Sequence, residues 1–347
     1  MRIASIIRPE SGNANYRARF PLVALQSRGH EHQLFDAHRL PHLNEFARFD
    51  VVHFCRLWEE PFQLLARALR DAGVGVTWDC DDYLPAIPKE TSSYRIVGGP
   101  RALQVARDMQ VMMDLAHIVT TPSPGLLERF ADSADDVRLI ENYIAPPMVR
   151  TRRPQRFNDY LHVGWVAGNE HRADVEPLRL RALVERLLEF YPRVEFVSLG
   201  LGLGIRHARY VHLPGTDVLE LTRFTGQLDI AIAPLDDTEF NQGRSNVKVK
   251  EYAAGGAAWL ASDVAPYRGL GTAEGGKVIA NDRWEREITA LIGDTARRRA
   301  LAANAFTWGA RQNIMLHLHE WEEAFGDAVA RGAAGDGNTA SRLERSV

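Results

Sequence analysis

Arg244, Lys248 and Glu251 stand at a spacing that suits a phosphorylated ligand. Lys248 and Glu251 are three residues apart, so on a helix they share one face, about one turn from each other. The free N–H groups and the dipole of a helix N-terminus attract anions, and Arg244 precedes such a terminus. A nucleoside diphosphate requires cations for its phosphates and a carboxylate for the paired hydroxyls of its ribose. A solvated helix with an ordinary Lys–Glu pair would have the same spacing.

The neighbouring residues predict the elements that must hold this group. An apolar run at 229–235 precedes it and another at 257–262 follows it, and both have strand length. Ser245 is a favourable N-cap and Gly255–Gly256 a favourable stop, so we expect a helix over about 246–254. The predicted order is therefore strand, loop, helix and strand.

The pattern Asn-x-x-Arg-Ser-x-x-Lys-x-x-Glu-Tyr-x-Ala-x-Gly occupies 241–256 and precedes an apolar strand. It resembles the donor-site signature of GT-B glycosyltransferases of the family 4 type. The resemblance implies that Glu251 binds the ribose hydroxyls of a nucleotide sugar. It also implies that the diphosphate lies at the helix N-terminus and its neighbours, which are Arg244, Ser245, Asn246 and Lys248. Gly243 stands where many members carry a glutamate near the donor sugar, so the contact to the sugar is unassigned.

The composition indicates a globular protein with room for two domains. The chain has 347 residues, of which 45% are hydrophobic and 25% charged. A formal net charge of −3 argues against a nucleic-acid partner. Cys55 and Cys80 are too few for a disulfide scaffold, which favours a reducing compartment. No signal peptide or membrane-spanning stretch is recognisable in this sequence, so we expect a cytoplasmic protein.

Strands and helices alternate through both halves of the chain, which predicts parallel, doubly wound sheets. With the resemblance, this indicates an α/β protein of the GT-B class, in which two Rossmann-like domains face each other across a cleft. We expect an acceptor domain over 1–150 and a donor domain over 151–309. A helix over 310–331 should cross back to the first domain, and 332–347 should be a disordered tail.

The expected elements follow from the apolar periodicity. Strands are predicted at 3–7, 33–35, 51–54, 74–78, 118–121, 137–140, 161–167, 194–199, 210–213, 229–235, 257–262 and 276–280. Helices are predicted near 17–28, 59–72, 100–116, 123–131, 175–190, 217–226, 246–254, 284–291, 294–306 and 310–330. The segment 144–158 is rich in proline and arginine and is interpreted as the linker between the domains. Its basic residues leave peripheral contact with a membrane open.

Parallel sheets bind ligands beyond the carboxyl ends of their strands, and the loop after the first strand carries small polar residues. Gly12 would let the backbone approach a ligand closely. By resemblance, this loop borders the donor sugar and the acceptor, which makes Gly12 and Asn13 candidates and Tyr16 and Arg17 weaker ones. A flexible connection would account for the same residues.

Two further strand ends in the first half are polar. His53 is interpreted as a structural residue and Arg56 as a candidate on the acceptor side. Asp79, Asp81 and Asp82 are costly together in a core, because like charges repel and lose hydration. We therefore expect them to face a cleft, a cation or an acceptor hydroxyl, although a turn with a helix cap would also use aspartates.

In the second half, the loop after the strand at 161–167 is the next candidate. The resemblance implies that this region gives glycine and basic residues to the diphosphate, at Gly164, His171 and Arg172. His171 could instead cap the following helix. The run at 199–204 lacks the Gly-x-Gly-x-x-Gly spacing of a dinucleotide site and is interpreted as a turn. By resemblance, the nucleobase belongs near 210–215.

The resulting hypothesis is a glycosyltransferase that moves a sugar from a nucleoside diphosphate to an acceptor hydroxyl, with retention of configuration as the family implies. Arg244 and Lys248 would stabilise the leaving diphosphate, and Asp81 and Asp82 would serve the acceptor or the sugar. The acceptor is a carbohydrate, a lipid-linked molecule or a small molecule. No metal or other cofactor is expected. A sugar-nucleotide epimerase of similar fold and a non-catalytic subunit that binds nucleotide sugars are the alternatives.

Overall fold

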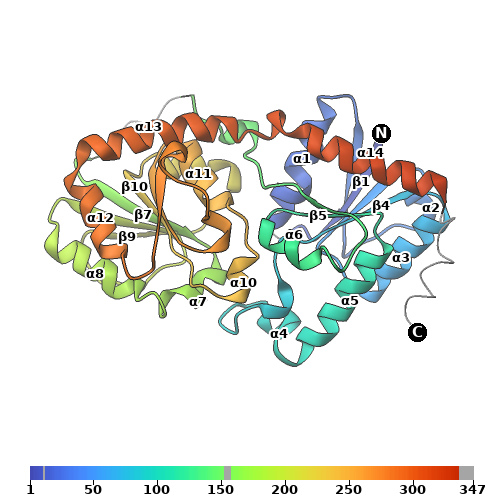
Figure 1. Ribbon diagram of the computed structural model, residues 1–347, viewed down its shortest axis with the longest axis horizontal. Coiled ribbons are helices and arrows are strands. Elements are labelled where there is room, and N and C mark those ends of the chain that lie inside the picture. Colours follow the sequence, from blue (N-terminus) through green and yellow to red (C-terminus); the bar gives the residue numbers. More distant parts are fainter. Residues whose placement is uncertain (11, 152–157, 336–347) are drawn as a thin grey trace. The chain divides into compact units, whose positions relative to one another are not determined.

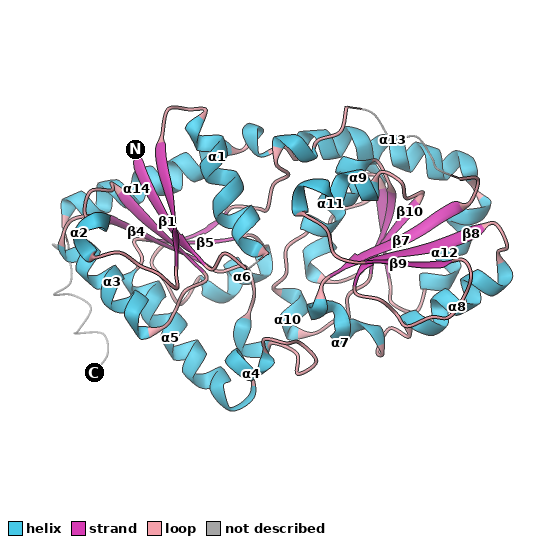
Figure 2. Cartoon of the chain, turned by 180° about the vertical axis from the view of Figure 1, so that it is seen from behind, coloured by secondary structure: helices cyan, strands magenta, loops and turns pink. Residues whose placement is uncertain are grey.

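The computed structural model describes residues 1–10, 12–151 and 158–335 (Figure 1). The chain divides into two compact units. Unit 1 consists of Met1–Asp82, Arg101–Glu141 and His317–Val347, and unit 2 consists of Tyr83–Pro100 and Asn142–Leu316. In the described residues each unit is built on a six-stranded parallel sheet with helices around it (Figure 2). The predicted α/β class with two doubly wound sheets is confirmed.

The sheet of unit 1 has the strand order β2-β1-β3-β4-β5-β6. Its strands are β1 (Arg2–Ile7), β2 (Glu31–Asp36), β3 (Val51–Cys55), β4 (Gly75–Asp79), β5 (Ile118–Thr121) and β6 (Val137–Leu139). Its α-helices are α1 (Phe20–Gln26), α2 (Leu43–Phe46), α3 (Glu60–Asp71), α5 (Ala102–Leu115), α6 (Pro124–Phe130) and α14 (Leu318–Ala334). The strand order reverses between β1 and β3, so their loops diverge there and leave room for a ligand.

The sheet of unit 2 has the order β12-β11-β10-β7-β8-β9. Its strands are β7 (Leu161–Ala167), β8 (Val194–Gly200), β9 (Tyr210–Leu213), β10 (Ile230–Ala233), β11 (Ala258–Ser262) and β12 (Gly276–Ile279). Its α-helices are α4 (Tyr94–Val97), α7 (Arg172–Val175), α8 (Leu180–Phe190), α9 (Leu221–Thr225), α10 (Glu239–Gln242), α11 (Val247–Gly255), α12 (Trp284–Gly293) and α13 (Thr295–Arg311). Here the order reverses between β7 and β10, as in a Rossmann domain.

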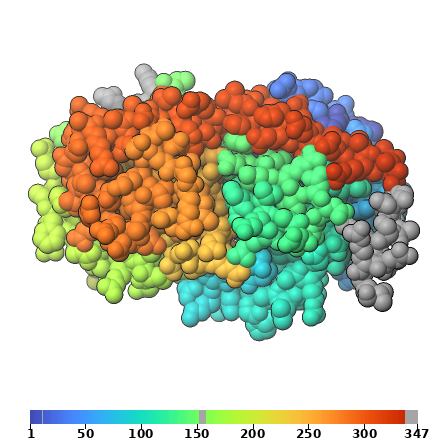
Figure 3. Space-filling view, viewed as in Figure 1, coloured from blue at the N-terminus to red at the C-terminus, as the bar shows by residue number. Residues whose placement is uncertain are grey.

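The strands of unit 2 are apolar on both sides because helices cover both faces of the sheet. Val163 and Trp165 of β7 pack in a cluster with α8 and α12. Val166 points the other way and packs with residues of α11 and α13. In the space-filling view of Figure 3, the orange residues of α11 to α13 form much of the surface of unit 2 on that side.

Helix α14 packs on the sheet of unit 1, against β3, β4 and β5, and is drawn in red in Figure 1. Gly75 of β4 and Gly332 of α14 allow a close approach, since a Cβ on Gly75 would lie 2.8 Å from a backbone carbon of Ala328. Trp321 is fully buried under the helix. α14 includes Gly332 to Ala334, the first residues of the predicted tail, while 336–347 lie outside the described residues.

Two predicted helices are divided. The helix expected over 175–190 is interrupted, because Arg179 takes a left-handed conformation with φ of 50° before α8 begins. The single helix expected over 310–330 is wrong in its first part, since α13 continues to Arg311 and α14 starts at Leu318. The backbone of 312–314 bonds to Ile144 instead: the Ile144 N–H donates to the Gln312 carbonyl at 2.8 Å, and the Ile314 N–H donates to the Ile144 carbonyl at 2.9 Å.

Ile144 belongs to the segment interpreted as the linker, of which residues 152–157 lie outside the described residues. The basic cluster expected there is therefore mostly untested. Among the helices that the structure describes, none has the length and apolar content needed to span a membrane.

Candidate functional site

Loops that leave β7 and β8 surround a pocket of 550 Å³ at the carboxyl edge of the unit 2 sheet. Its lining residues are Ala167, Gly168, Asn169, Arg172, Gly200, Leu201, Gly202, Gly204 and His212. Arg172, a predicted phosphate ligand, is exposed there. The glycine-rich run, interpreted from the sequence as a turn and not as a dinucleotide site, supplies four of the nine lining residues. Glycines directly after a buried strand were the signal that sequence reasoning left unused.

Helix α11 carries the predicted donor residues and begins at Val247. Its N-cap is Asn246, not Ser245 as predicted. The Ser245 hydroxyl is engaged elsewhere, because it accepts a hydrogen bond from the Asn142 side-chain amide at 3.0 Å. The predicted stop is confirmed: Gly256 has a φ of 81°, a conformation that glycine adopts without strain.

Lys248 and Glu251 form an ion pair on α11, with Lys248 Nζ 3.0 Å from Glu251 Oε2. This is the pairing that an ordinary Lys–Glu spacing predicts. Its burial is unusual, however, since only 17% of the lysine side chain and 3% of the glutamate side chain are exposed. Burial removes hydrating water from both charged groups, and this penalty offsets most of their mutual attraction. Such a pair therefore adds little to the stability of the fold.

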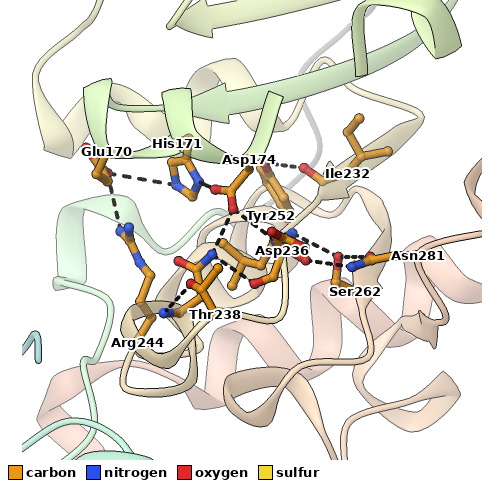
Figure 4. Close-up of polar contacts among 12 residues, drawn as sticks. Glu170, His171, Asp174, Ile232, Asp236, Thr238, Arg244, Tyr252, Ser262 and Asn281 are labelled. Carbon is orange, nitrogen blue, oxygen red and sulfur yellow. Dashed lines mark hydrogen bonds and ion pairs between the residues drawn. The ribbon is translucent and has the colours of Figure 1, made fainter. Parts of the chain in front are cut away.

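Glu170, in the loop after β7, lies beside two of the predicted cationic residues, Arg244 and His171 (Figure 4). Its Oε1 lies 3.3 Å from Arg244 Nη2 and 3.8 Å from His171 Nε2. Burial would raise the pKa of Glu170, but the charges of Arg244, His171 and Lys248 outweigh it and lower the pKa from 4.5 to about 2. The residues expected to hold a diphosphate thus surround one carboxylate that the sequence did not single out.

Asp174 joins three loops around this site (Figure 4). It is 1% exposed, and its Oδ2 lies 3.1 Å from His171 Nδ1. Its Oδ1 accepts from the Asn241 side-chain amide at 2.7 Å and from the Asp236 backbone N–H at 2.9 Å. One buried carboxylate therefore holds together three parts of the chain, which are the segment after β7, the segment after β10 and the short helix α10. His171 does not cap α7 through a side-chain hydrogen bond.

Lys250 is a second residue that sequence reasoning missed. It is completely buried, its Nζ donates to the Asn142 carbonyl at 3.1 Å, and the Tyr143 ring centroid lies 4.4 Å from Nζ. Asn142 contacts both Lys250 and Ser245, so it fixes the entry to α11. No local signal marks this burial, because the partner Asn142 lies 108 positions away in the chain.

Gly164 is not part of this group. It lies in the middle of β7, three residues before the strand ends, and a Cβ there would meet the Leu228 side chain at 2.3 Å. Leu228 packs on the sheet at this point, which explains why the position is a glycine. Gly168 is the glycine at the strand end, where a Cβ would meet the Glu170 carboxylate at 2.3 Å.

Unit 1 brings its predicted polar residues together beside the reversal between β1 and β3. The Asn13 amide donates to Asp81 Oδ1 at 2.8 Å. Arg56 Nη1 lies 3.4 Å from Asp81 Oδ1 and 3.0 Å from Asp82 Oδ2. Gly12 is exposed beside Asn13, and no atom lies within 4 Å of the position of its missing Cβ. The two aspartates thus face a cation, as expected.

Asp79 is separated from the other two aspartates by burial. It is 0% exposed, and its Oδ2 lies 2.7 Å from Arg17 Nη2 and accepts from the Thr120 hydroxyl at 2.5 Å. Arg17 is equally buried and lies over the Trp321 ring at 5.0 Å. His53 is buried beside them, and desolvation lowers its pKa from 6.5 to about 4. These residues support the core of unit 1 and are out of reach of a substrate.

Within the described residues, no group of three or more histidine, cysteine, aspartate or glutamate side chains is arranged to hold a metal ion. The polar clusters of both units instead pair their carboxylates with arginine, lysine or amide groups.

Comparison with known proteins shows similarity at the level of the fold. No family model matches the sequence, and no curated protein does. Sucrose-phosphate synthase from Thermosynechococcus elongatus superposes with a TM-score of 0.69 at 15% identity, over 95% of this chain and 99% of that one. The Anabaena protein Alr3699/HepE, solved in complex with UDP and glucose, gives 0.66 at 11% identity, over 93% and 98%.

This chain has the GT-B fold. A proposed UDP-N-acetylglucosamine 2-epimerase from Listeria monocytogenes is also similar, with a TM-score of 0.56 at 12% identity, over 91% of this chain and 94% of that one. Proteins with this fold thus include one named as a sucrose-phosphate synthase and one named as a sugar-nucleotide epimerase, and identities of 11–15% do not assign this chain to one family.

Proposed function

We propose that this GT-B protein is a glycosyltransferase of the family 4 type, which transfers a sugar from a nucleoside diphosphate to an acceptor hydroxyl with retention of configuration. The observation that carries the proposal is the buried Lys248–Glu251 pair on α11, placed in one electrostatic group with Arg244 and Glu170. Buried charge of both signs at the carboxyl edge of a Rossmann-like sheet suits a ligand that has phosphates and ribose hydroxyls.

In this proposal the donor binds to unit 2. Glu251 accepts hydrogen bonds from the ribose, while Lys248, Arg244 and the N-terminus of α11 hold the diphosphate. Arg172 extends the cationic surface into the glycine-lined pocket, which leaves room for a further part of the nucleotide. Because the diphosphate departs with the bonding electrons of the broken glycosidic bond, cations fixed around it stabilise the transition state more than the ground state.

The glycosyl acceptor is assigned to unit 1, where Asn13, Arg56, Asp81 and Asp82 form the polar cluster beside the sheet reversal. Carboxylates paired with an arginine and an amide can orient acceptor or sugar hydroxyls and accept hydrogen bonds from them. The acceptor is a carbohydrate, a lipid-linked molecule or a small molecule, and the reaction takes place in the cytoplasm in this proposal.

Titration calorimetry with nucleoside diphosphates tests the donor site. Binding of UDP, GDP, ADP or TDP is expected, and Glu251→Ala should weaken it by roughly 1–3 kcal/mol because ribose hydroxyls lose a charged partner. Glu189→Ala, which removes an exposed glutamate from α8, is the matched control. If no nucleoside diphosphate binds at millimolar concentration, the proposed donor site is wrong.

Transfer itself is tested by incubation of the corresponding nucleotide sugars with and without an acceptor library. A glycosyltransferase releases nucleoside diphosphate at a rate that rises with the acceptor. Epimerisation of the sugar without an acceptor would identify the epimerase alternative, and binding without any turnover would identify the non-catalytic alternative.

A further inference from the structure

Asn142 holds the N-terminal part of α11 at two points. It belongs to unit 2 and is 6% exposed. Its backbone carbonyl accepts a hydrogen bond from Lys250 Nζ at 3.1 Å, and its side-chain Nδ2 donates to Ser245 Oγ at 3.0 Å. Ser245 lies two residues before the helix, and Lys250 is the fourth residue in it. One residue from a remote part of the chain therefore contacts both sides of the point where α11 begins.

The contact with Lys250 fixes the backbone of residue 142. Lys250 is completely buried, and its Nζ lies 4.4 Å from the centroid of the Tyr143 ring. A buried ammonium group has lost its hydrating water, so loss of the carbonyl acceptor would be costly. Because this acceptor belongs to the backbone, a substitution of the Asn142 side chain leaves it in place. The hydrogen bond to Ser245 is therefore a separate contribution of the Asn142 side chain.

The direction of the hydrogen bond between Asn142 and Ser245 determines what Ser245 can do. An amide nitrogen only donates, so the Ser245 oxygen accepts, and one of its two lone pairs is occupied. The single hydrogen of the hydroxyl therefore points away from Asn142 Nδ2, toward an acceptor elsewhere. Ser245 is partly exposed whereas Asn142 is buried, so Ser245 is the member of the pair that a ligand can contact.

We propose that Asn142 is a positioning residue for the nucleotide donor, and that it orients the Ser245 hydroxyl to donate a hydrogen bond to the diphosphate. This inference rests on the proposed function, in which the diphosphate lies at the N-terminus of α11. Phosphate oxygens carry negative charge and only accept, so a serine binds them through its hydrogen. A hydroxyl without a fixed partner rotates, and fixing it beforehand removes that cost from binding. Asn142 itself does not touch the donor.

Removal of the two side chains should have unequal effects on the binding of UDP. Ser245→Ala deletes a hydrogen bond to a charged group and should weaken UDP binding by about tenfold or more. Asn142→Ala leaves the hydroxyl present but no longer oriented, so we expect a loss of about threefold to fivefold. In the Ser245→Ala background, Asn142→Ala should cause no further loss, because it acts only through the hydroxyl. Uridine has no phosphate, so its affinity should not change in any of these variants.

Asn142→Asp reverses the direction of the hydrogen bond at nearly constant side-chain volume. A carboxylate only accepts, so it would take the Ser245 hydrogen and withdraw it from the diphosphate. The loss of UDP affinity should be at least as large as in Ser245→Ala, about tenfold or more. The added negative charge also repels the diphosphate. Asn142→Asp in the Ser245→Ala background measures this repulsion alone, and we expect a smaller loss there than in the wild-type background.

Titration calorimetry of the full chain with UDP and with uridine is the test, and thermal unfolding shows whether each variant is folded. Asn304→Ala is the matched control. Asn304 is another asparagine of unit 2, is exposed on α13, and its amide donates to the Thr272 carbonyl at 2.8 Å. Its removal should change neither affinity.

Three outcomes in folded protein would overturn the positioning role. They are unchanged UDP affinity in either single alanine variant, an undiminished further loss when Asn142→Ala is added to Ser245→Ala, and equal losses for UDP and uridine. The last would mean that Asn142 supports the whole of α11. If Asn142→Ala does not fold, Asn142→Asp decides, and equal losses of UDP affinity in both backgrounds would overturn the role. Failure of UDP to bind the wild type would contradict the proposed function together with this role, whereas the other outcomes contradict this role alone.

Discussion

At the scale of single residues, the candidate donor site is a set of positive and negative side chains that pair with one another. Lys248 pairs with Glu251, and Arg244 pairs with Glu170. A diphosphate would compete with Glu170 for its cations, and a ribose would compete with Lys248 for Glu251. The same residues that lower the pKa of Glu170 to about 2 are thus the proposed phosphate ligands.

Lys248→Ala should weaken the binding of UDP by at least about tenfold and that of uridine much less, since the lysine is assigned to phosphate. Parallel calorimetric titrations with both ligands measure the difference. Lys277→Ala is the control. Lys277 lies on β12, the edge strand of the same sheet, and it also pairs with a glutamate, since its Nζ is 2.7 Å from Glu287 Oε2. Equal losses for UDP and uridine would show that the lysine has another role.

Glu170→Gln should strengthen the binding of nucleoside diphosphates severalfold, because it removes a negative charge that competes for Arg244 and Lys248. Its affinity for uridine should not change. Glu176→Gln, an exposed position shortly after α7, controls for the change in net charge. A loss of UDP affinity in Glu170→Gln would mean that the carboxylate positions Arg244 for the phosphate and does not oppose it.

At the scale of elements, the position of α11 depends on how closely α13 approaches it. A Cβ on Gly309 of α13 would lie 2.4 Å from the backbone of Ala253 and Ala254. Only a residue without a side chain permits this contact, and the contact holds the helix that carries Lys248 and Glu251. Asp174 and Asn142 fix the loops at the other side of α11 by hydrogen bonds.

Gly309→Ala should therefore destabilise unit 2 by about 1–3 kcal/mol through overpacking and weaken UDP binding as α11 shifts. Gly326→Ala is the matched control within a helix, since no atom lies within 4 Å of the position of its missing Cβ in α14. That substitution should be neutral or stabilise by up to about 1 kcal/mol, as glycine is a poor helix former. Thermal unfolding measures both variants, and equal effects would refute the packing argument.

At the scale of the whole molecule, the two units carry separate clusters of charge. Unit 2 holds the residues proposed for the nucleotide, and unit 1 holds Asn13, Arg56, Asp81 and Asp82. Each cluster lies where the strand order of its own sheet reverses, and each of the two sheets has one such reversal. The GT-B fold by itself serves several chemistries, so the division of roles must be tested at the sites.

Asp81→Asn and Asp82→Asn should leave the affinity for UDP nearly unchanged and lower the rate of transfer by at least about tenfold, because they keep the side-chain volume and remove the charge that orients a hydroxyl. Calorimetry and an acceptor-dependent assay measure the two quantities separately. Asp71→Asn, at the exposed end of α3, is the control. Loss of UDP binding in folded Asp81→Asn protein would contradict the assignment of donor and acceptor to different units.

The sequence alone determined most of what depends on neighbouring residues. Apolar runs of strand length predicted every strand of both sheets to within a few residues, and Gly256 marked the end of α11, because side-chain periodicity and left-handed glycine are local properties. The i, i+3 spacing likewise placed Lys248 beside Glu251. These features need no knowledge of distant partners.

Tertiary structure decided which of these residues are buried and with whom they pair. Asp79 became a core residue because Arg17, 62 positions away, reaches it, whereas Asp81 stayed in a polar cluster. The Ser245 hydroxyl accepts from Asn142 and does not cap α11, whose N-cap is Asn246. The Lys250 ammonium is buried because the Asn142 carbonyl accepts its hydrogen bond and the Tyr143 ring lies beside it. The glycines after β8 acquired a pocket only through their position beside the loop of β7. Each depends on chain segments that are remote in sequence, which spacing and propensity do not encode.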